Sequence, residues 1–397
     1  MRILYITTSL LKNESASIRN VSLLNGLIEN DCQITVITLD YSLESEDVFL
    51  RSTLRKEIKV KKIPIPYFNK IKSILRSDCK PKYKFIFTSI LRKIKEFITP
   101  FIFFPDILCE GIKSCKTIKI EQKEYDYIIS SSDSKTSHFI ARTLIKNNNL
   151  QTPWIQIWGD PWQKDVGLVK LNYFLKRKIK KAEKSLLKEA DKVFYISELT
   201  AIDIKQSFPE MKEKISFLLR SYLEKIKSQV LVKDKYTFSY TGSISNRNLN
   251  CLLNSVKEYN SSHEKKIEVQ FYGINSNDIK SLERLNFVKI FPRVSFEKVL
   301  DVYKNSDVLV YIDNMGDTTQ IPGKIYDYFG TDKVILGLYE NRDIKNFLEQ
   351  FNRIELYNNI EKIDLENVIK KIGTQKPLEK FSPKYVACEF LNKIKGV

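Results

Sequence analysis

VLVYIDNMGDTTQIPGKIYDYFG, residues 308–330, begins with an apolar run of strand length and ends in an amphipathic segment that leads to a second apolar run at 334–338. Pro322 is typical of the first turn of a helix, so a helix is expected between the two apolar runs. A strand, a polar loop, a helix and another strand in this order predict two parallel strands joined by a crossover helix.

The same alternation of short apolar runs and longer amphipathic segments recurs along the whole chain. Within 18–28, apolar residues occur at positions 18, 21, 24, 27 and 28, which is the spacing of one helix face. Two such series predict an α/β protein with two Rossmann-like, doubly wound parallel sheets. The predicted strands are 3–6, 34–39, 127–129, 154–158 and 193–196, followed by 238–240, 267–272, 288–291, 308–312 and 334–338.

A charged segment between the two series, LEKIKSQVLVKDKY at 223–236, has no clear hydrophobic period and is predicted to be a linker. It separates an N-terminal domain, 1–222, from a C-terminal domain, 237–375. The end of the chain, 376–397, contains an amphipathic helical pattern that can pack back on the N-terminal domain.

The composition is that of a globular protein, with 43% hydrophobic and 29% charged residues. No window contains the roughly 18 uninterrupted apolar residues of a membrane span, and the start MRILYIT lacks the pattern of a signal peptide. Six cysteines are scattered without CxxC spacing, which favours reduced thiols in a cytoplasmic protein. With only two histidines, a multi-histidine metal site is not expected. No bound cofactor is predicted.

The formal net charge of +18 predicts an acidic partner, such as a nucleotide, a nucleic acid or an anionic lipid surface. Nine Lys or Arg lie between 70 and 95, interleaved with apolar residues, and a second basic cluster occupies 175–184. Basic helices with an apolar face can lie on an anionic bilayer, and a solvated helix face is the alternative. A peripheral contact with the inner face of the cytoplasmic membrane is therefore one expectation for the segment 70–95.

Ligands of parallel sheets bind beyond the carboxyl ends of the strands, where helix starts offer free N–H groups to phosphate. After the strand at 238–240 come Gly242, Ser243 and Arg247, which can hold a diphosphate. Gly242 permits close approach of the backbone, and Arg247 supplies charge. A plain turn with a surface arginine is the alternative.

The loop after the strand at 308–312 is the richest in candidate residues. Lys324 is predicted in the first helical turn, which the helix dipole disfavours unless an anion is bound nearby. Asp327, three residues on, can accept hydrogen bonds from ribose hydroxyls, whereas a surface ion pair between Lys324 and Asp327 is the alternative. The predicted donor-side residues of this segment are Thr319, Gln320, Pro322, Gly323, Lys324 and Asp327.

Three strand exits of the N-terminal half carry candidate acceptor-side residues. Asp160, in QIWGDPW (156–162), can orient an acceptor hydroxyl or act as a base, and helix capping is its alternative role. Where a dinucleotide-binding protein would have GxGxxG, the chain has no such glycines, which argues against NAD or FAD. The candidate residues are Ser17, Arg19, Ser132, His138, Asp160 and Trp162, of which His138 is more typical of a plain helix face than of a catalytic residue.

With these segments in view, the chain resembles the family 4 glycosyltransferases of the GT-B fold, in which two Rossmann-like domains face a cleft. The resemblance extends over nearly the whole length and is most specific in the last of its segments. The matching segments, in order, are SIRN, CQITVIT, YDYIISSSDSKTSHFIA, TPWIQIWGDPW, ADKVFYISE, YTGSISNRN, IEVQFYG and IPGKIYDYFGTDKVIL.

The resemblance implies transfer of a sugar, with retention and without a metal, from a nucleoside-diphosphate donor to a glycan or lipid-linked acceptor in bacterial surface polysaccharide synthesis. It implies that 1–222 binds the acceptor and 237–375 the donor. Arg247 and Lys324 would neutralise the leaving diphosphate, with Asp160 as the third catalytic residue. The family's two glutamates, which have seven residues between them, correspond here to Thr319 and Asp327.

Two other functions fit parts of the pattern. A GT-B-fold epimerase or phosphorylase would use the same fold on a sugar nucleotide or a phosphorylated sugar. A nucleic-acid-binding protein is suggested by the charge alone, and no zinc-finger, RRM or helix-turn-helix pattern supports it.

Overall fold

The computed structural model describes residues 1–41, 46–76, 103–163, 173–228, 233–273, 282–315 and 321–396. The chain forms two compact units. The first consists of Met1–Leu219 together with Ala387–Val397, and the second of Arg220–Val386.

The first unit is built on a seven-stranded sheet in the order β3-β2-β1-β4-β5-β6-β7, and every pair is parallel. Its central strands are buried on both faces, as near-continuous apolar sequences such as TPWIQIW predict. The chain order reverses between neighbouring strands β1 and β4, which makes this the topological switch point. The strands are β1 Arg2–Thr7, β2 Gln33–Asp40, β3 Lys59–Pro64, β4 Tyr127–Ser131, β5 Trp154–Trp158, β6 Lys192–Tyr195 and β7 Ile215–Phe217.

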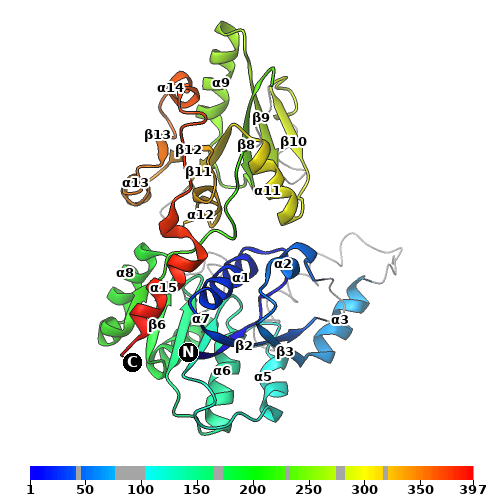
Figure 1. Cartoon of the computed structure of the whole chain (residues 1–397), viewed down its shortest axis with the longest axis vertical. Helices are drawn as coiled ribbons and strands as arrows, with labels where there is room; N and C mark the ends of the chain where they lie inside the picture. The colour runs from blue at the N-terminus through cyan, green and yellow to red at the C-terminus, as the bar shows by residue number, and fades with distance from the viewer. Residues whose placement is uncertain are drawn as a thin grey trace. The chain divides into compact units, whose positions relative to one another are not determined.

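Helices cover both faces of this sheet (Figure 1). The end of the chain also packs here: Phe390 meets Phe194 of β6 with ring centroids 5.2 Å apart, and the Tyr127 hydroxyl donates a hydrogen bond to the Ile394 carbonyl (3.3 Å). The helices are α1 Ser15–Ile28, α2 Val48–Thr53, α3 Pro66–Arg76, α5 Glu110–Ser114, α6 Thr136–Asn147, α7 Tyr173–Glu189, α8 Glu198–Ser207 and α15 Pro383–Ile394, the last of which enters this unit at Ala387.

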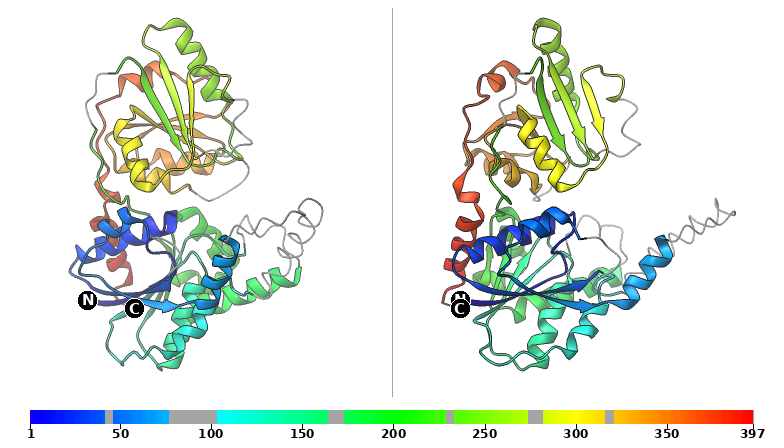
Figure 2. Two further views of the ribbon diagram at one scale, coloured as in Figure 1. Left: turned by 90° about the vertical axis from the view of Figure 1, so that its right-hand side faces the viewer. Right: turned by 45° about the vertical axis from the view of Figure 1, so that its right-hand side comes forward.

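The second unit contains a six-stranded, all-parallel sheet in the order β10-β9-β8-β11-β12-β13, seen side by side in Figure 2. Here the switch point lies between β8 and β11. The strands are β8 Tyr236–Thr241, β9 Ile267–Tyr272, β10 Val288–Phe291, β11 Val308–Ile312, β12 Val334–Tyr339 and β13 Ile354–Asn358. The helices are α9 Asn250–Ser262, α11 Phe296–Asn305, α12 Lys324–Phe329, α13 Arg342–Glu349 and α14 Leu365–Lys370.

The predicted fold class, two doubly wound parallel sheets, is confirmed. Among the helices that the structure describes, none is both long and apolar enough to cross a membrane. The basic segment 70–95 lies outside the described residues beyond Arg76, the last residue of α3. The second basic cluster, 175–184, belongs to α7.

Candidate functional site

Two adjacent glycines line the switch point of the second unit. Gly242 directly follows β8 with φ +119°, and its N–H donates to the Tyr272 carbonyl (2.7 Å). Gly273 directly follows β9 with φ +91°, and a Cβ atom there would lie 3.6 Å from the Gly242 backbone. Both backbone conformations favour glycine. At Gly242 the missing side chain also makes room for the Lys324 ammonium, because a Cβ atom there would lie 2.9 Å from Nζ.

The loop after β8 is tied to the loop after β11. Asn246, with φ +60°, donates from its amide nitrogen to the Met315 carbonyl (2.8 Å), and the Met315 N–H donates to the Asn246 carbonyl (3.0 Å). These hydrogen bonds hold the two segments that were predicted to bind the donor in one fixed relation on either side of the switch point.

Two cations converge on the Tyr240 ring at this point. The Lys324 ammonium lies 3.7 Å from the ring centroid, and the Arg247 guanidinium carbon lies 5.9 Å from it. Arg247 is held by hydrogen bonds to the carbonyls of Ser243 (3.2 Å) and Ile312. The face of the tyrosine ring offers each cation a partial attraction.

Neither cation has a carboxylate partner among the residues that the structure describes. Burial, together with the charge of Arg247, lowers the pKa of Lys324 well below its ordinary value. Nearby Asp313 is fully buried; its carboxylate accepts the N–H groups of Asn314 (2.8 Å) and Glu340 (3.4 Å), and burial raises its pKa. Lys324 and Arg247 are therefore two neighbouring cationic side chains that make no ion pair with a described carboxylate, although the charge of Arg247 acts on Asp313. Such a pair can attract an anionic ligand.

Asp327 lies elsewhere in the unit's interior. Its carboxylate accepts two hydrogen bonds of 3.3 Å from Arg220, and the side chains are 7% and 3% exposed. Burial raises the pKa of Asp327 to about 6, although the charge of Arg220 opposes the rise. The alternative predicted from the sequence, a surface ion pair between Lys324 and Asp327, is wrong. The Asp327 carboxylate pairs instead with Arg220, which lies 107 residues away in the sequence.

The other predicted donor-side residues differ in how they relate to Arg247 and Lys324. Ser243 is exposed, and its carbonyl accepts the Tyr240 hydroxyl (2.8 Å) as well as Arg247. Pro322 and Gly323 lead into α12, accepting the first backbone N–H groups of that helix. Thr319 and Gln320 lie outside the described residues.

At the switch point of the first unit, the carboxylate of Asp133 lies beside two buried cations, of which Lys135 contacts it and Arg19 acts on it by charge alone. Lys135 is 7% exposed, and its ammonium contacts Asp133 (3.4 Å) and the Asp160 carbonyl (2.8 Å). Arg19 of α1 is 6% exposed and donates to Ser131 Oγ (3.4 Å) and to the Ser132 carbonyl. The Asp133 side chain itself remains 43% exposed.

This arrangement keeps Asp133 ionised and accessible. Burial works to raise the pKa of Asp133, but the charges of Lys135 and Arg19 outweigh it and leave the pKa below its ordinary value. Gly159, directly after β5, makes room: a Cβ atom there would lie 2.6 Å from Asp133 Oδ2 and 2.9 Å from Arg19 Nη1. The result is an anionic hydrogen-bond acceptor at the carboxyl edge of the sheet.

The predicted acceptor-side residues divide into those near Asp133 and those away from it. Ser132 lies beside it and accepts the Gly159 N–H (3.3 Å), and Asp160 follows Gly159. Ser17 is fully buried and accepts the Lys12 N–H (3.3 Å), so it shapes the loop after β1.

His138 and Trp162 lie in the core rather than at the surface. His138 is fully buried, stacks on Trp158 with centroids 4.3 Å apart, and has Nδ1 2.8 Å from Ser130 Oγ. Burial lowers its pKa well below the ordinary value, so the ring is neutral. Trp162 is 4% exposed and stacks on Phe104 at 5.4 Å. Both side chains fill the interior, and the expectation that they face an acceptor has no support in this geometry.

Asp133, Lys135, Tyr240 and Gly273 are the residues that sequence reasoning missed. Asp133 and Lys135 belong to SSSDSKTSH, residues 130–138, and all nine residues of this segment are polar. The sequence therefore offered no reason to prefer these two as functional residues. Gly273 had a usable signal, since it follows a predicted strand just as Gly242 does. Within the described ranges, no group of three or more His, Cys, Asp or Glu is arranged to hold a metal ion.

Solved structures resemble the chain over its whole length. TarM has a TM-score of 0.60 at 11% identity, with 100% of this chain and 99% of TarM covered. The catalytic domain of starch synthase IV from Arabidopsis thaliana, bound to ADP and acarbose, has a TM-score of 0.55 at 9% identity, covering 99% and 98%. Anabaena HepE in complex with UDP-glucose has a TM-score of 0.53 at 11% identity, covering 99% and 95%.

The chain has the GT-B fold. Sequence comparison adds no family: no family model matches, and no curated protein matches either. At 9–11% sequence identity, these structures show that the fold is shared and do not show a shared function. The function of this chain depends on the residues at its two switch points.

Proposed function

We propose that this GT-B chain is a glycosyltransferase that takes a sugar from a nucleoside diphosphate and passes it to a hydroxyl of an acceptor. The observation that carries the proposal is the pair Arg247 and Lys324, which converge on Tyr240 at the switch point of the second unit without a described carboxylate partner. HepE with UDP-glucose and starch synthase IV with ADP support it, since both structures pair this fold with a nucleoside diphosphate or its sugar.

The two cations suit the chemistry of the leaving group. Cleavage of the bond between the sugar and the diphosphate builds negative charge on the departing phosphate and positive charge on the sugar. Cations fixed beforehand at that phosphate stabilise the transition state without reorganising during the reaction. We assign this role to Arg247 and Lys324, with Gly242 giving the phosphate access to the backbone; transfer with retention and without a metal is part of the proposal.

Asp133 is proposed to accept a hydrogen bond from the acceptor hydroxyl in the first unit. Its lowered pKa makes it a weak base, so it orients the hydroxyl and strengthens the nucleophile by hydrogen bonding. Lys135 and Arg19 are positioning residues that hold the carboxylate. Asp160, the residue proposed from the sequence, lies in the adjoining loop and is the natural comparison.

The proposed biological setting is bacterial surface polysaccharide synthesis, with a glycan or lipid-linked acceptor. α7 supports a peripheral membrane contact: Tyr173 and Phe174 at its start are 70% and 78% exposed beside a run of exposed Lys and Arg. Aromatic and basic side chains on one helix suit an anionic bilayer surface. We expect sedimentation with phosphatidylglycerol vesicles at low salt and release at high salt; absence of binding at low salt would contradict the membrane contact alone.

Analysis of the reaction products distinguishes glycosyl transfer from epimerisation of the sugar nucleotide. Wild-type protein is incubated with UDP-, GDP- and ADP-sugars, with and without a panel of glycan acceptors. Acceptor-dependent release of nucleoside diphosphate with formation of a new glycoside supports transfer, whereas a changed sugar still attached to the nucleotide without an acceptor indicates epimerisation.

With transfer established, Asp133→Asn is expected to lower it about 10- to 100-fold, the effect of losing one charged hydrogen bond. Donor binding should be unchanged, because Asp133 lies in the other unit from Arg247 and Lys324. Asp160→Asn in parallel serves as the comparison. A larger loss in Asp160→Asn than in Asp133→Asn would move the proposed role to Asp160.

A further inference from the structure

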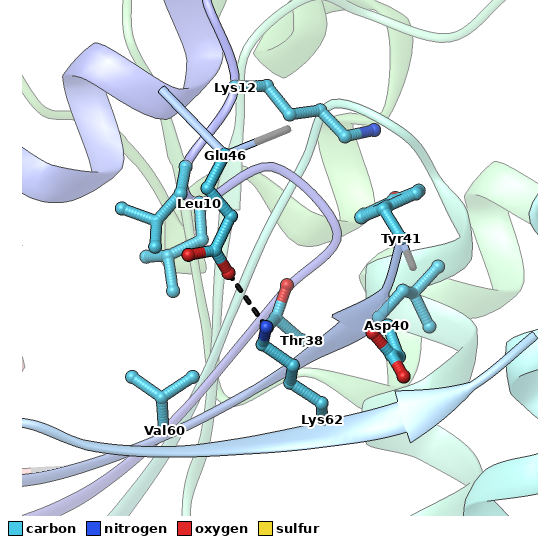
Figure 3. A pocket seen from close by; sticks show the side chains of 10 residues that line it. Leu10, Lys12, Thr38, Asp40, Tyr41, Glu46, Val60 and Lys62 are labelled. Carbon is cyan, nitrogen blue, oxygen red and sulfur yellow. Dashed lines mark hydrogen bonds and ion pairs between the residues drawn. The ribbon is translucent and has the colours of Figure 1, made fainter. Parts of the chain in front are cut away.

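A pocket of about 210 Å³ opens in the first unit at the carboxyl ends of β1 and β2 (Figure 3). It is far larger than one water molecule, which occupies about 30 Å³, and smaller than the roughly 300–1,000 Å³ of pockets for drug-sized ligands. Its lining contains leucines from the loop after β1 and from β2 together with charged side chains.

The charged groups around this pocket are balanced in sign. The lining contains Lys12 from the loop after β1, Lys62 from β3, Asp40 at the end of β2, and Glu46. Of these, Glu46 pairs with Lys62 (2.7 Å; Figure 3). Two further charged residues lie near the pocket without lining it: Arg51 pairs with Glu46, and the charge of Glu14 acts on Lys12. They add one positive and one negative charge, so the net charge around the pocket is unchanged. An anion would meet two carboxylates here and a cation two ammonium groups, so neither is favoured.

The hydrogen-bonding groups are of both kinds and reach the pocket from several directions. In the part of the chain that the structure describes, the Asp40 carboxylate has no hydrogen-bond or ion-pair partner, so it can accept from a ligand. The Lys12 ammonium, 3.4 Å from the Tyr41 ring centroid, can donate, and the nearly buried Thr38 hydroxyl can do both. Each hydroxyl of a sugar is itself a donor and an acceptor, which matches this mixture.

We infer that this pocket binds a neutral, polyhydroxylated ligand, namely an uncharged sugar residue of the acceptor. The inference rests on the proposed glycosyl transfer and names the chemical class of its acceptor. The contrast with the second unit is direct: Arg247 and Lys324 present two cations and suit a diphosphate, whereas Lys12, Lys62, Asp40 and Glu46 present no net charge.

Saturation-transfer difference NMR with free sugars tests the inference. Glucose, galactose, mannose and N-acetylglucosamine are the neutral probes, and glucuronate and glucose 1-phosphate are the charged ones. We expect at least one neutral sugar to receive saturation and the charged analogues to bind more weakly. Asp40→Ala should weaken binding about tenfold, Asp40→Asn less, and Glu57→Gln, at an exposed position outside the lining, not at all.

Two results would overturn the inference: no saturation of any neutral sugar, or binding that Asp40→Ala and Lys12→Met leave unchanged. Preferred binding of glucose 1-phosphate or glucuronate that Asp40→Ala weakens and Lys324→Ala leaves unchanged would equally reject an uncharged ligand, because it would place the charged sugar in this pocket and not at the diphosphate site. Titration of the same preparation with nucleoside diphosphates keeps the two proposals apart, since a protein that binds a diphosphate but no sugar fails this inference alone.

Discussion

Replacing Lys324 by alanine is expected to reduce turnover of the sugar nucleotide by about 100- to 1,000-fold, the usual cost of removing one preorganised group that stabilises transition-state charge. Lys324 has no described anionic partner in the free protein, so its amine is available to bind the phosphate as an ammonium ion. Arg247→Ala should show a loss of similar size. The measurement is the rate of nucleoside diphosphate release under saturating acceptor.

Lys345→Ala is the matched control, because Lys345 is a half-exposed lysine of the same unit that pairs with Glu349. It should turn over like wild type.

The pH dependence of diphosphate binding tests Lys324 in a second way. Because the pKa of Lys324 is lowered in the free protein, a bound diphosphate should raise it again, and binding should take up protons. The affinity for the diphosphate should therefore fall as the pH rises above the lowered pKa of the free protein. Full activity in Lys324→Ala would contradict the assigned role.

Arg220→Met is expected to lower the free energy of unfolding by about 3 kcal/mol at neutral pH, because it leaves the Asp327 carboxylate buried without its partner. Urea denaturation followed by circular dichroism measures the change. Lys225→Met, at an exposed position that pairs with Glu379, is the control and should change stability by well under about 1 kcal/mol. Equal midpoints for Arg220→Met and wild type would show that the buried pair contributes nothing.

The same pair predicts a pH dependence of stability. Asp327 has a pKa of about 6 in the folded chain against an ordinary value of 3.8, so the folded state binds more protons between these values. The contribution of this group to the free energy of unfolding therefore falls as pH rises from about 4 to about 6, by about 3 kcal/mol in all. Asp327→Asn should remove that slope; an unchanged slope would mean that another group causes it.

The central strands of the parallel sheets could be predicted from the sequence, whereas among the edge strands β10 was predicted and β3, β7 and β13 were not. β5 and β11 are buried along their whole length and have continuous apolar sequences. β3, with the sequence KVKKIP, is an edge strand whose lysines face solvent, so it shows no apolar run. β13 is half-buried throughout, and β7 has only three residues, which is too short for a period.

The candidate site was predictable where loops follow strands, and not where partners are distant in the sequence. Gly242, Arg247 and Lys324 could be named because parallel strands bring their carboxyl ends to one edge. The pairing of Asp327 with Arg220 depends on how the interior of the unit packs across 107 residues, which no local pattern encodes. Asp133 and Lys135 are set apart from their polar neighbours only by the buried Arg19 and the missing side chain at Gly159.

Calorimetric titration with UDP, GDP and ADP, alongside the corresponding monophosphates, tests the central claim most directly: Arg247 and Lys324 form a diphosphate site. The account predicts that one diphosphate binds more tightly than its monophosphate, and that Lys324→Ala and Arg247→Ala each weaken it about 10- to 100-fold. If no diphosphate binds, or if both variants bind as wild type does, the loops after β8 and β11 are not the donor site.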